Sequence, residues 1–239
     1  MMENEAFPII AFGAMKLNIV LPPKAEAAFR AYYEFLEQQG KNLNLTAISG
    51  TEEVARLHFL DSIALLNAES FKNKSVIDVG SGAGFPGVPI KIAEPTINLT
   101  LLDATGKKVA FLKELCEKLD IEATLINTRA EEAAHESDKR EAYDIAVSRA
   151  VAGLSVLCEL CLPFVRVGGM FITMKSTDSG DEIEEAKNAI TTLGAQIHEN
   201  YDYKIPDTDI THRAILIQKT TNTPDTYPRR FAKIQKRPL

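Results

Sequence analysis

A glycine-rich turn constrains the fold of this 239-residue chain more than any other feature. Residues 76–79 form a short apolar run, and Asp78-Val79-Gly80-Ser81-Gly82-Ala83-Gly84-Phe85-Pro86-Gly87 leads from it into a helical pattern that ends near residue 93. Glycine permits a tight turn and lets a ligand approach the backbone closely. With a strand before it and a helix after it, the turn predicts a nucleotide-type ligand rather than a tight turn without one.

Strand and helix patterns alternate after this turn. Strands are expected at 98–102, 123–126, 143–147 and 170–174, and helices at 106–119, 154–164 and 181–193. Two strand-like runs, 196–203 and 213–219, close the chain. Parallel strands need crossover connections, so the alternation predicts an α/β fold with a mostly parallel seven-stranded sheet. The two closing runs have no helix between them, which predicts one antiparallel edge strand.

Helical patterns without strands precede the turn. Residues 24–39 repeat apolar side chains at helical spacing, and Gly40 is expected to end that helix. Thr51 is expected to cap a second helix that runs to about residue 67. The predicted organisation is an N-terminal helical section at 1–67, a ligand-binding domain at 68–220 and a basic tail at 221–239.

The glycine spacing separates two classes of adenosine ligand. In a dinucleotide fingerprint, Gly-x-Gly-x-x-Gly, the third glycine would fall at position 85, where this chain has Phe85. Glycines at 80, 82 and 84 resemble instead the first motif of class I S-adenosylmethionine-dependent methyltransferases. Asp103, at the end of the next strand, suits the ribose hydroxyls of either ligand. Phe85 and the two closing strands favour the methyl donor over NAD.

Several further segments match one family together. They are Asn44-Leu45-Thr46-Ala47, His58-Phe59-Leu60-Asp61-Ser62, Leu101-Leu102-Asp103 with Gly106-Lys107-Lys108, Arg129-Ala130-Glu131-Glu132, Ser148-Arg149-Ala150, Tyr227-Pro228-Arg229-Arg230 and Lys236-Arg237-Pro238-Leu239. With these motifs the chain resembles the glucose-inhibited division protein B family, bacterial methyltransferases that modify guanine N7 in small-subunit ribosomal RNA. The resemblance runs from about residue 40 to the C-terminus. The chain departs from it at Ser176, where the family commonly has glycine, and at Phe231-Ala232, where the family has Pro-Gly.

The resemblance implies a Rossmann-like class I methyltransferase with S-adenosyl-L-methionine bound by the 68–220 domain. It carries the cofactor contacts over to Gly80, Phe85, Ala130, Glu131 and Arg149, and the turn and the second strand end add Gly82 and Asp103. Phe85 offers an apolar wall whose face tolerates a cationic sulfonium. A surface salt bridge is the alternative role for Arg149.

The implied reaction needs alignment more than proton transfer. Guanine N7 carries an in-plane lone pair, so its methylation needs no general base. Arg149, Lys175 and Asp61 are the candidate catalytic residues, because a carboxylate suits the N1 and N2 donors of guanine and a cation, Arg213 included, suits O6. His58, Asp61 and Ser62 share one helical face, and either a guanine pocket or a structural tether to the sheet explains them.

The three cysteines predict neither a metal site nor a disulfide framework. Cys158 and Cys161 form Cys-x-x-Cys, but no second pair or histidine cluster completes a zinc site, so core packing is favoured. Cys116 is interpreted in the same way. The small, odd cysteine count, the acidic N-terminus and the lack of an apolar run of about 20 residues predict a cytoplasmic protein without a membrane segment.

Charge is distributed unevenly along the chain. The net charge is −6, yet residues 227–239 contain no acid and five basic side chains: Arg229, Arg230, Lys233, Lys236 and Arg237. These five are predicted to bind RNA through phosphates, although a disordered solubilising tail has the same composition. The predicted function is methyl transfer to N7 of a guanine in 16S ribosomal RNA. The alternatives are a methyltransferase for a small molecule or protein, a catalytically silent binding module and, last, an NAD dehydrogenase.

Overall fold

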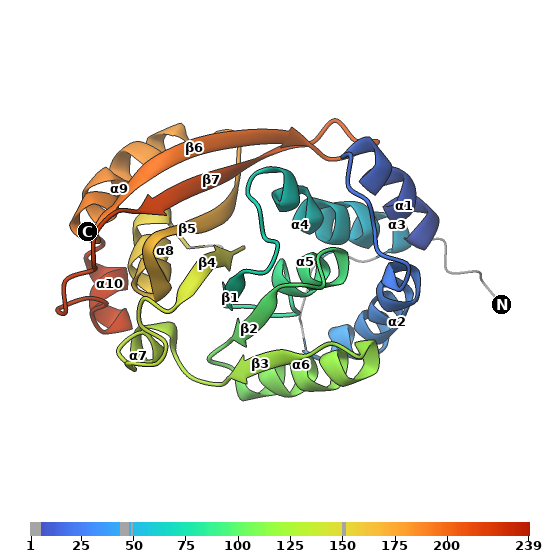
Figure 1. Ribbon diagram of the computed structural model, residues 1–239, viewed down its shortest axis with the longest axis horizontal. Coiled ribbons are helices and arrows are strands. Elements are labelled where there is room, and N and C mark those ends of the chain that lie inside the picture. Colours follow the sequence, from blue (N-terminus) through green and yellow to red (C-terminus); the bar gives the residue numbers. More distant parts are fainter. Residues whose placement is uncertain (1–5, 44–47, 49, 150–151) are drawn as a thin grey trace.

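In the computed structural model, which describes residues 6–43, 48, 50–149 and 152–239, the chain forms one seven-stranded sheet (Figure 1). The strands are β1 (Ser75–Val79), β2 (Asn98–Leu102), β3 (Ala123–Ile126), β4 (Tyr143–Ser148), β5 (Val165–Ser176), β6 (Ala195–Lys204) and β7 (Thr211–Lys219). Their order is β3-β2-β1-β4-β5-β7-β6. The first five pair in parallel, while β7 runs antiparallel to both β5 and β6. This confirms the mostly parallel sheet with antiparallel pairing at one edge, and the antiparallel strand itself lies one place in from that edge.

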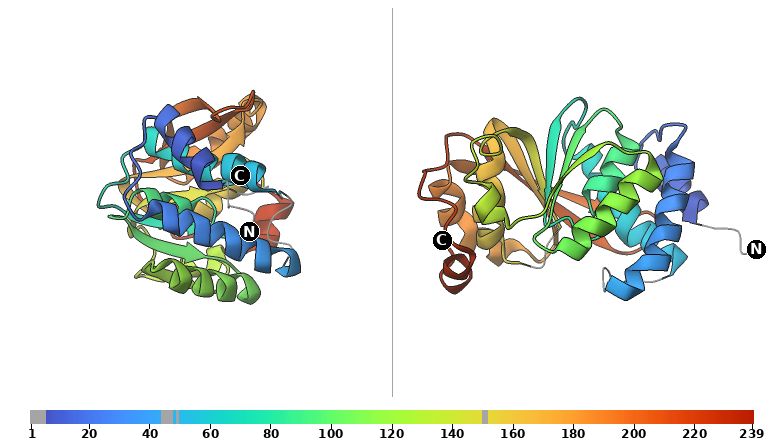
Figure 2. Two further views of the ribbon diagram at one scale, coloured as in Figure 1. Left: turned by 90° about the vertical axis from the view of Figure 1, so that its right-hand side faces the viewer. Right: turned by 90° about the horizontal axis from the view of Figure 1, so that it is seen from below.

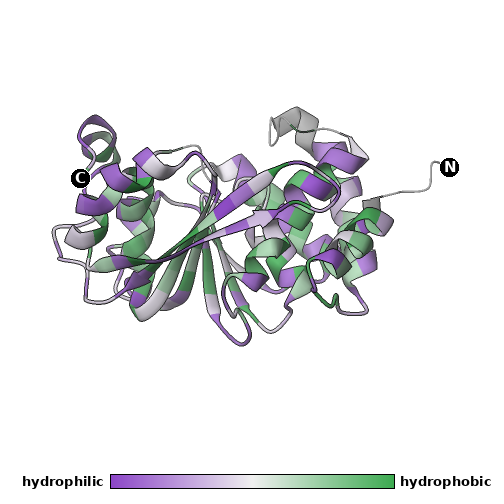
Figure 3. Cartoon of the chain, turned by 90° about the horizontal axis from the view of Figure 1, so that it is seen from above, coloured by the Kyte–Doolittle hydropathy of each residue, from purple (hydrophilic) through white to green (hydrophobic). Residues whose placement is uncertain are grey.

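Helices cover both faces of the sheet (Figure 2). One core joins the sheet to α1 (Ala6–Lys16), α2 (Ala25–Leu43), the helical run described next, α5 (Gly87–Ala93) and α6 (Gly106–Leu119). A second core joins the opposite face to α7 (Ala130–Ala133), α8 (Leu154–Cys161), η3 (Leu162–Phe164) and α9 (Gly180–Thr192). Hydrophobic residues concentrate along the strands between these two layers (Figure 3). The sheet is therefore buried on both faces, as parallel sheets require.

A continuous helical run connects the N-terminal helices to β1. It consists of α3 (Thr51–Val54), the π-helix η1 (Ala55–Leu60), α4 (Asp61–Ile63) and the 3-10 helix η2 (Ala64–Asn67). Gly50, and not Thr51, occupies the position before the first turn, and no side chain caps it. The predicted cap is thus wrong, because the Thr51 hydroxyl hydrogen-bonds the hydroxyl of Tyr33 at 2.9 Å instead.

Other differences from the expected elements have local causes. Helix α2 continues beyond Gly40 to Leu43, so the predicted stop is wrong. Helix α1 was not predicted, because Gly13 interrupts its apolar pattern; yet a Cβ at that position would overlap the side chain of Leu60. Glycine there allows α1 to pack directly against the π-helix. The C-terminal helix α10 (Phe231–Lys236) was not predicted either.

Candidate functional site

The glycine turn lies at the carboxyl end of β1, and hydrogen bonds fix its path. The backbone N–H groups of Gly80 and Ser81 donate to the carbonyl of Leu102, at 2.8 and 3.0 Å, which ties the turn to the end of β2. Gly80 and Gly82 have φ angles of 76° and 58°, a region that favours glycine. A Cβ added at Gly80 would meet no atom within 4 Å, and one at Gly82 only the Gly80 carbonyl, at 3.9 Å. Open space therefore borders the backbone where the sequence predicts the ligand.

Two aspartates brace this turn. The Oδ2 atom of Asp103 accepts from the N–H of Gly82 at 3.1 Å, and Oδ1 accepts from the N–H of Thr105 at 2.8 Å. Asp78 is fully buried, and its Oδ2 accepts from the N–H of Gly87 at 2.9 Å. Its Oδ1 has no hydrogen-bond partner among the described residues, and burial raises the pKa of this carboxyl to about 7. The sequence pattern did not single out Asp78 as a site residue, although it opens the glycine motif.

Phe85 belongs to an aromatic stack and not to an open wall. Its ring lies 5.3 Å from Tyr32 and 4.5 Å from His58, at interplanar angles of 11° and 21°. The guanidinium of Arg149 lies over the same ring, 4.8 Å from its centroid. The side chain is only 5% exposed. In this structure the cation that Phe85 faces is therefore Arg149.

Arg149 follows β4 and lies at the centre of a buried polar cluster. Its Nη2 donates to Nδ1 of His58 at 2.8 Å, and Nη1 donates to the Leu57 carbonyl at 3.1 Å. Because a guanidinium only donates, Nδ1 of His58 is an acceptor without a proton. Burial, followed by the charge of Arg149, lowers the pKa of His58 to about 3, so this histidine is neutral near pH 7. Burial also lowers the pKa of Arg149.

Asp61 connects the helical run to the far edge of the sheet. Its Oδ1 accepts from the Tyr203 hydroxyl of β6 at 2.7 Å and lies 2.9 Å from Nδ1 of His212 of β7. Its Oδ2 lies 3.7 Å from Nη1 of Arg149. The carboxylate hydrogen bond raises the pKa of His212. These contacts of Asp61 are the ones that a structural tether to the sheet requires. Ser62 turns its hydroxyl to the carbonyl of His58 in its own helix.

The other candidate residues lie at separate places along the same sheet edge. Ala130 and Glu131 begin α7 after β3, with Glu131 only 9% exposed. Lys175 donates to Glu182 of α9 at 2.7 Å and to the carbonyl of Ala152 at 2.8 Å. Arg213 forms a two-point ion pair with Asp202 at 2.6 and 2.8 Å. The bonds of Lys175 and Arg213 thus lead away from the Arg149 cluster.

The C-terminal segment is ordered, which excludes the disordered tail. Ile234 of α10 is fully buried, and Arg229 binds the fully buried Glu159 through two side-chain bonds of 2.8 and 2.6 Å. Arg229 therefore has an intramolecular partner, whereas the exposed side chains of Arg230, Lys233, Lys236 and Arg237 have none among the residues that the structure describes. The sequence could not reveal Glu159 as this partner because the two residues are 70 positions apart.

Several other observations delimit the site. The three cysteines are free and buried, as core packing predicts. Within the described residues, no group of three or more His, Cys, Asp or Glu side chains could hold a metal ion, and no helix is long and apolar enough to cross a membrane. The motif at 44–47 and the alanine at 150 lie outside those residues.

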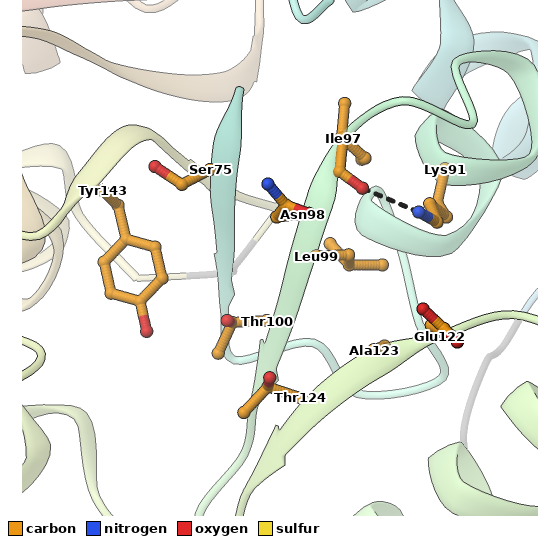
Figure 4. A pocket seen from close by; sticks show the side chains of 10 residues that line it. All are labelled: Ser75, Lys91, Ile97, Asn98, Leu99, Thr100, Glu122, Ala123, Thr124 and Tyr143. Atoms are coloured by element: carbon orange, nitrogen blue, oxygen red, sulfur yellow. Dashed lines mark hydrogen bonds between the residues drawn. The ribbon is translucent and has the colours of Figure 1, made fainter. Parts of the chain in front are cut away.

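A cavity of about 430 Å³ lies at the opposite end of the strands, where β1 to β4 begin (Figure 4). Its lysine, Lys91, directs Nζ to the carbonyls of Pro95 and Ile97, at 2.9 and 2.7 Å. Ligands of open α/β sheets bind at the carboxyl ends of the strands. This cavity is therefore not the site that the glycine turn predicts.

Comparison with known proteins decides the family. The model of the family described as rRNA small subunit methyltransferase G matches residues 25–210. The chain belongs to this family. It is 42% identical over 237 residues to ribosomal RNA small subunit methyltransferase G of Alkaliphilus metalliredigens, covering 98% of this chain and 99% of the relative. It is 43% identical over 228 residues to the protein of the same name from Acetivibrio thermocellus, with 95% and 94% covered.

Solved structures agree with this family at the level of the fold. The structure of M. jannaschii TYW2 in complex with AdoMet superposes with a TM-score of 0.50 at 13% identity, covering 66% of this chain and 74% of the other. The chain is thus an enzyme of the rRNA small subunit methyltransferase G family with a class I methyltransferase fold, as the motifs predict.

Proposed function

We propose that this enzyme transfers the methyl group of S-adenosylmethionine to N7 of a guanine in small-subunit (16S) ribosomal RNA. The observation that carries the proposal is family membership over nearly the full length of the relatives. This substrate implies a cytoplasmic location, where ribosomal particles are found. The alternative methyl acceptor is a small molecule or a protein. Such an acceptor gives no role to the exposed basic side chains of the C-terminal segment, which are Arg230, Lys233, Lys236 and Arg237.

The residues present fit the cofactor. Open space beside Gly80 and Gly82 would receive it, and each oxygen of Asp103 keeps a lone pair for a ribose hydroxyl beyond the one N–H that it accepts. Ala130 and Glu131 would flank the adenine, and Arg149, braced by Phe85, would bind the methionine carboxylate. When bound, the cofactor supplies an electrophilic methyl group on a sulfonium sulfur.

The polar cluster is suited to positioning and not to proton abstraction. The Nδ1 lone pair of His58 is occupied by Arg149, Oδ1 of Asp61 by Tyr203 and His212, and Oδ2 of Asp61 lies 3.7 Å from Nη1 of Arg149. Guanine N7 needs no base, so alignment is the main requirement, and alignment contributes roughly 7–11 kcal/mol in favourable cases. We therefore assign Arg149 to contact with the cofactor or guanine O6. Asp61 and Lys175 become positioning residues.

The decisive experiment is methyl transfer from labelled S-adenosylmethionine to small ribosomal subunits from cells that lack this gene. We expect label in 7-methylguanosine at a single position of the RNA. Cofactor binding without label in any ribosomal particle would refute the proposed substrate.

Substitution of Arg149 tests its assigned contact with the cofactor or with guanine O6. Arg149→Ala is expected to lower turnover by at least ten-fold, because the cluster loses the cation around which it is built. Arg166→Ala, which removes a half-exposed arginine from an ion pair with Asp144, is the matched control and should retain activity. Full turnover by Arg149→Ala would disprove the assignment.

A further inference from the structure

A cavity of about 540 Å³ separates α7 from the C-terminal segment. It is lined by Arg129, Glu131, Glu132, His135, Pro228, Arg229, Arg230, Phe231 and Ala232. Of the residues assigned above to the cofactor, the lining contains Glu131 and none of Gly80, Gly82, Phe85, Asp103, Ala130 or Arg149. We propose that this cavity binds one unstacked nucleotide of the RNA substrate, beside the cofactor site and at a place distinct from the guanine that is methylated. The inference rests on the proposed RNA substrate and adds a second anchoring point for it.

The walls of the cavity are held by hydrogen bonds from other elements. Arg140 donates to the carbonyls of Thr223 and Tyr227, at 2.8 and 2.9 Å. The Pro228 carbonyl accepts from Nε2 of His135 at 2.9 Å, which joins the C-terminal segment to the turn that follows α7. The backbone N–H and the Nε atom of Arg229 both donate to Glu159, which holds the backbone next to Arg230 in place. These bonds fix the C-terminal segment to the rest of the chain, so little further ordering of the protein opposes binding.

Aromatic and cationic groups on the rim match the two parts of a nucleotide. The guanidinium of Arg129 lies 5.7 Å from the centroid of Phe231, and the Arg129 side chain is 56% exposed, so both planes can stack with a base. Arg230 is exposed, and its side chain forms no hydrogen bond or ion pair with any other residue that the structure describes. A cation without a carboxylate partner suits a phosphate.

Two carboxylates in the lining, those of Glu131 and Glu132, favour a base over a phosphate. Glu132 accepts from the Thr128 hydroxyl at 3.0 Å and keeps further acceptor capacity toward amino groups of a base. The volume also lies within the range of about 300–1,000 Å³ that is typical of small-ligand sites. In this arrangement Arg230 would bind a phosphate, and the base would lie between Phe231 and Glu132. These charges therefore favour a single-stranded RNA segment as the ligand of the cavity.

The test is equilibrium binding of a fluorescein-labelled 15-nucleotide single-stranded RNA to the full-length enzyme at several salt concentrations. Phe231→Leu, which keeps apolar bulk but removes the ring, should weaken binding roughly ten-fold with little change in salt slope, while Phe231→Trp should bind as well as wild type. Arg230→Ala should reduce the log–log salt slope by about 0.7. Phe12→Ala and Lys24→Ala, exposed residues on the N-terminal side, are the matched controls.

Cofactor affinity and thermal unfolding of each variant show that it is folded. Equal RNA affinity of wild type, Phe231→Leu and Phe231→Trp, together with an unchanged slope for Arg230→Ala, would overturn the nucleotide site. Methylation of small subunits by the wild type in that case would leave the proposed function intact. Absence of both RNA binding and methylation in the wild type would refute the proposed function itself.

Discussion

At the scale of single residues, burial gives His58 and Asp78 opposite pH dependences. Both lie next to the glycine turn, and each favours its neutral form, because a charge there would be removed from water. For His58 the pKa falls to about 3, and for Asp78 it rises to about 7. Histidine is neutral above its pKa and aspartic acid is neutral below its pKa. The effects of the two residues on stability can therefore be distinguished by their opposite dependence on pH.

His58 should make the fold sensitive to acid. Below pH 6.5 the unfolded chain takes up a proton at this histidine, while the folded chain stays neutral down to about pH 3, so stability is lost as pH falls through this window. Between pH 7 and 5 the loss is up to about 2 kcal/mol. Urea unfolding of wild type and His58→Asn at both pH values measures it. An identical pH dependence for the two proteins would contradict the pKa shift.

Asp78 should act in the opposite sense. Its folded pKa exceeds the unfolded value of 3.8, so its contribution to stability is complete below that value and declines as pH rises to about 7. Asp78→Asn keeps an acceptor for the Gly87 amide and removes the charge. The variant should therefore gain stability relative to wild type on going from pH 5 to pH 7, by about 2 kcal/mol. The same urea titrations provide the measurement, and a constant difference would argue against this effect.

At the scale of elements, Asp61 holds the helical run 51–67 against β6 and β7. Removing one partner of a buried ionic cluster leaves the other groups without compensation. Asp61→Ala should therefore lower the free energy of unfolding by about 3–5 kcal/mol, and Tyr203→Phe by about 1–3 kcal/mol. Asp202→Ala, which breaks an exposed ion pair with Arg213 on the neighbouring strand, should cost at most about 1 kcal/mol. Chemical denaturation of the three variants tests this ranking.

Local patterns predicted many of the regular elements between residues 68 and 220 well. Strands 98–102 and 123–126 and helix 106–119 agree with the structure residue by residue, because their apolar periodicity and flanking turns are contained within each segment. Helix α10 was not predicted because Ile234 is its one buried residue, and a single apolar residue among basic side chains gives no helical periodicity. Helix α1 was concealed by Gly13, whose role depends on Leu60, far along the chain. Short-range patterns carry no information on such contacts.

The sequence indicated where the glycine turn and Asp103 lie, but it did not indicate which side chains bind one another in the site. The glycine turn and Asp103 lie together as expected, since both follow parallel strands at one edge of the sheet. Tyr203 and His212, which hold Asp61, come from strands 142 and 151 positions away and have no spacing signal. The five basic residues at the C-terminus looked equivalent in sequence, and only the fold separates Arg229 from the other four.

At the scale of the whole molecule, an acidic protein presents a small basic face. Replacing Arg230, Lys233, Lys236 and Arg237 together by alanine should weaken RNA binding and reduce the log–log salt slope by up to about 3, at about 0.7 for each phosphate that the variant no longer neutralises. Cofactor affinity should be unchanged. Salt titrations of RNA binding provide the measurement, and an unchanged slope would assign this face another role.

Truncation after residue 226 would be a poorer experiment for this purpose. It also removes Arg229 and leaves Glu159, which is 0% exposed, as an unpaired buried charge. We expect the truncated protein to lose stability as well as RNA affinity. A melting temperature equal to that of the wild type would contradict the structural role of Arg229.

The place of β7 between β5 and β6 affects how the chain matures during synthesis. Strand β6 leaves the ribosome before β7, yet β7 is the strand that joins it to the rest of the sheet. At about 5–20 residues per second, β6 has no partner for about a second or more. The edge of the sheet formed by β6 and β7 can therefore assemble only after residues 211–219 have been synthesised. A nascent chain stalled before residue 211 would expose an unpaired strand edge that chaperones or another stalled copy could bind.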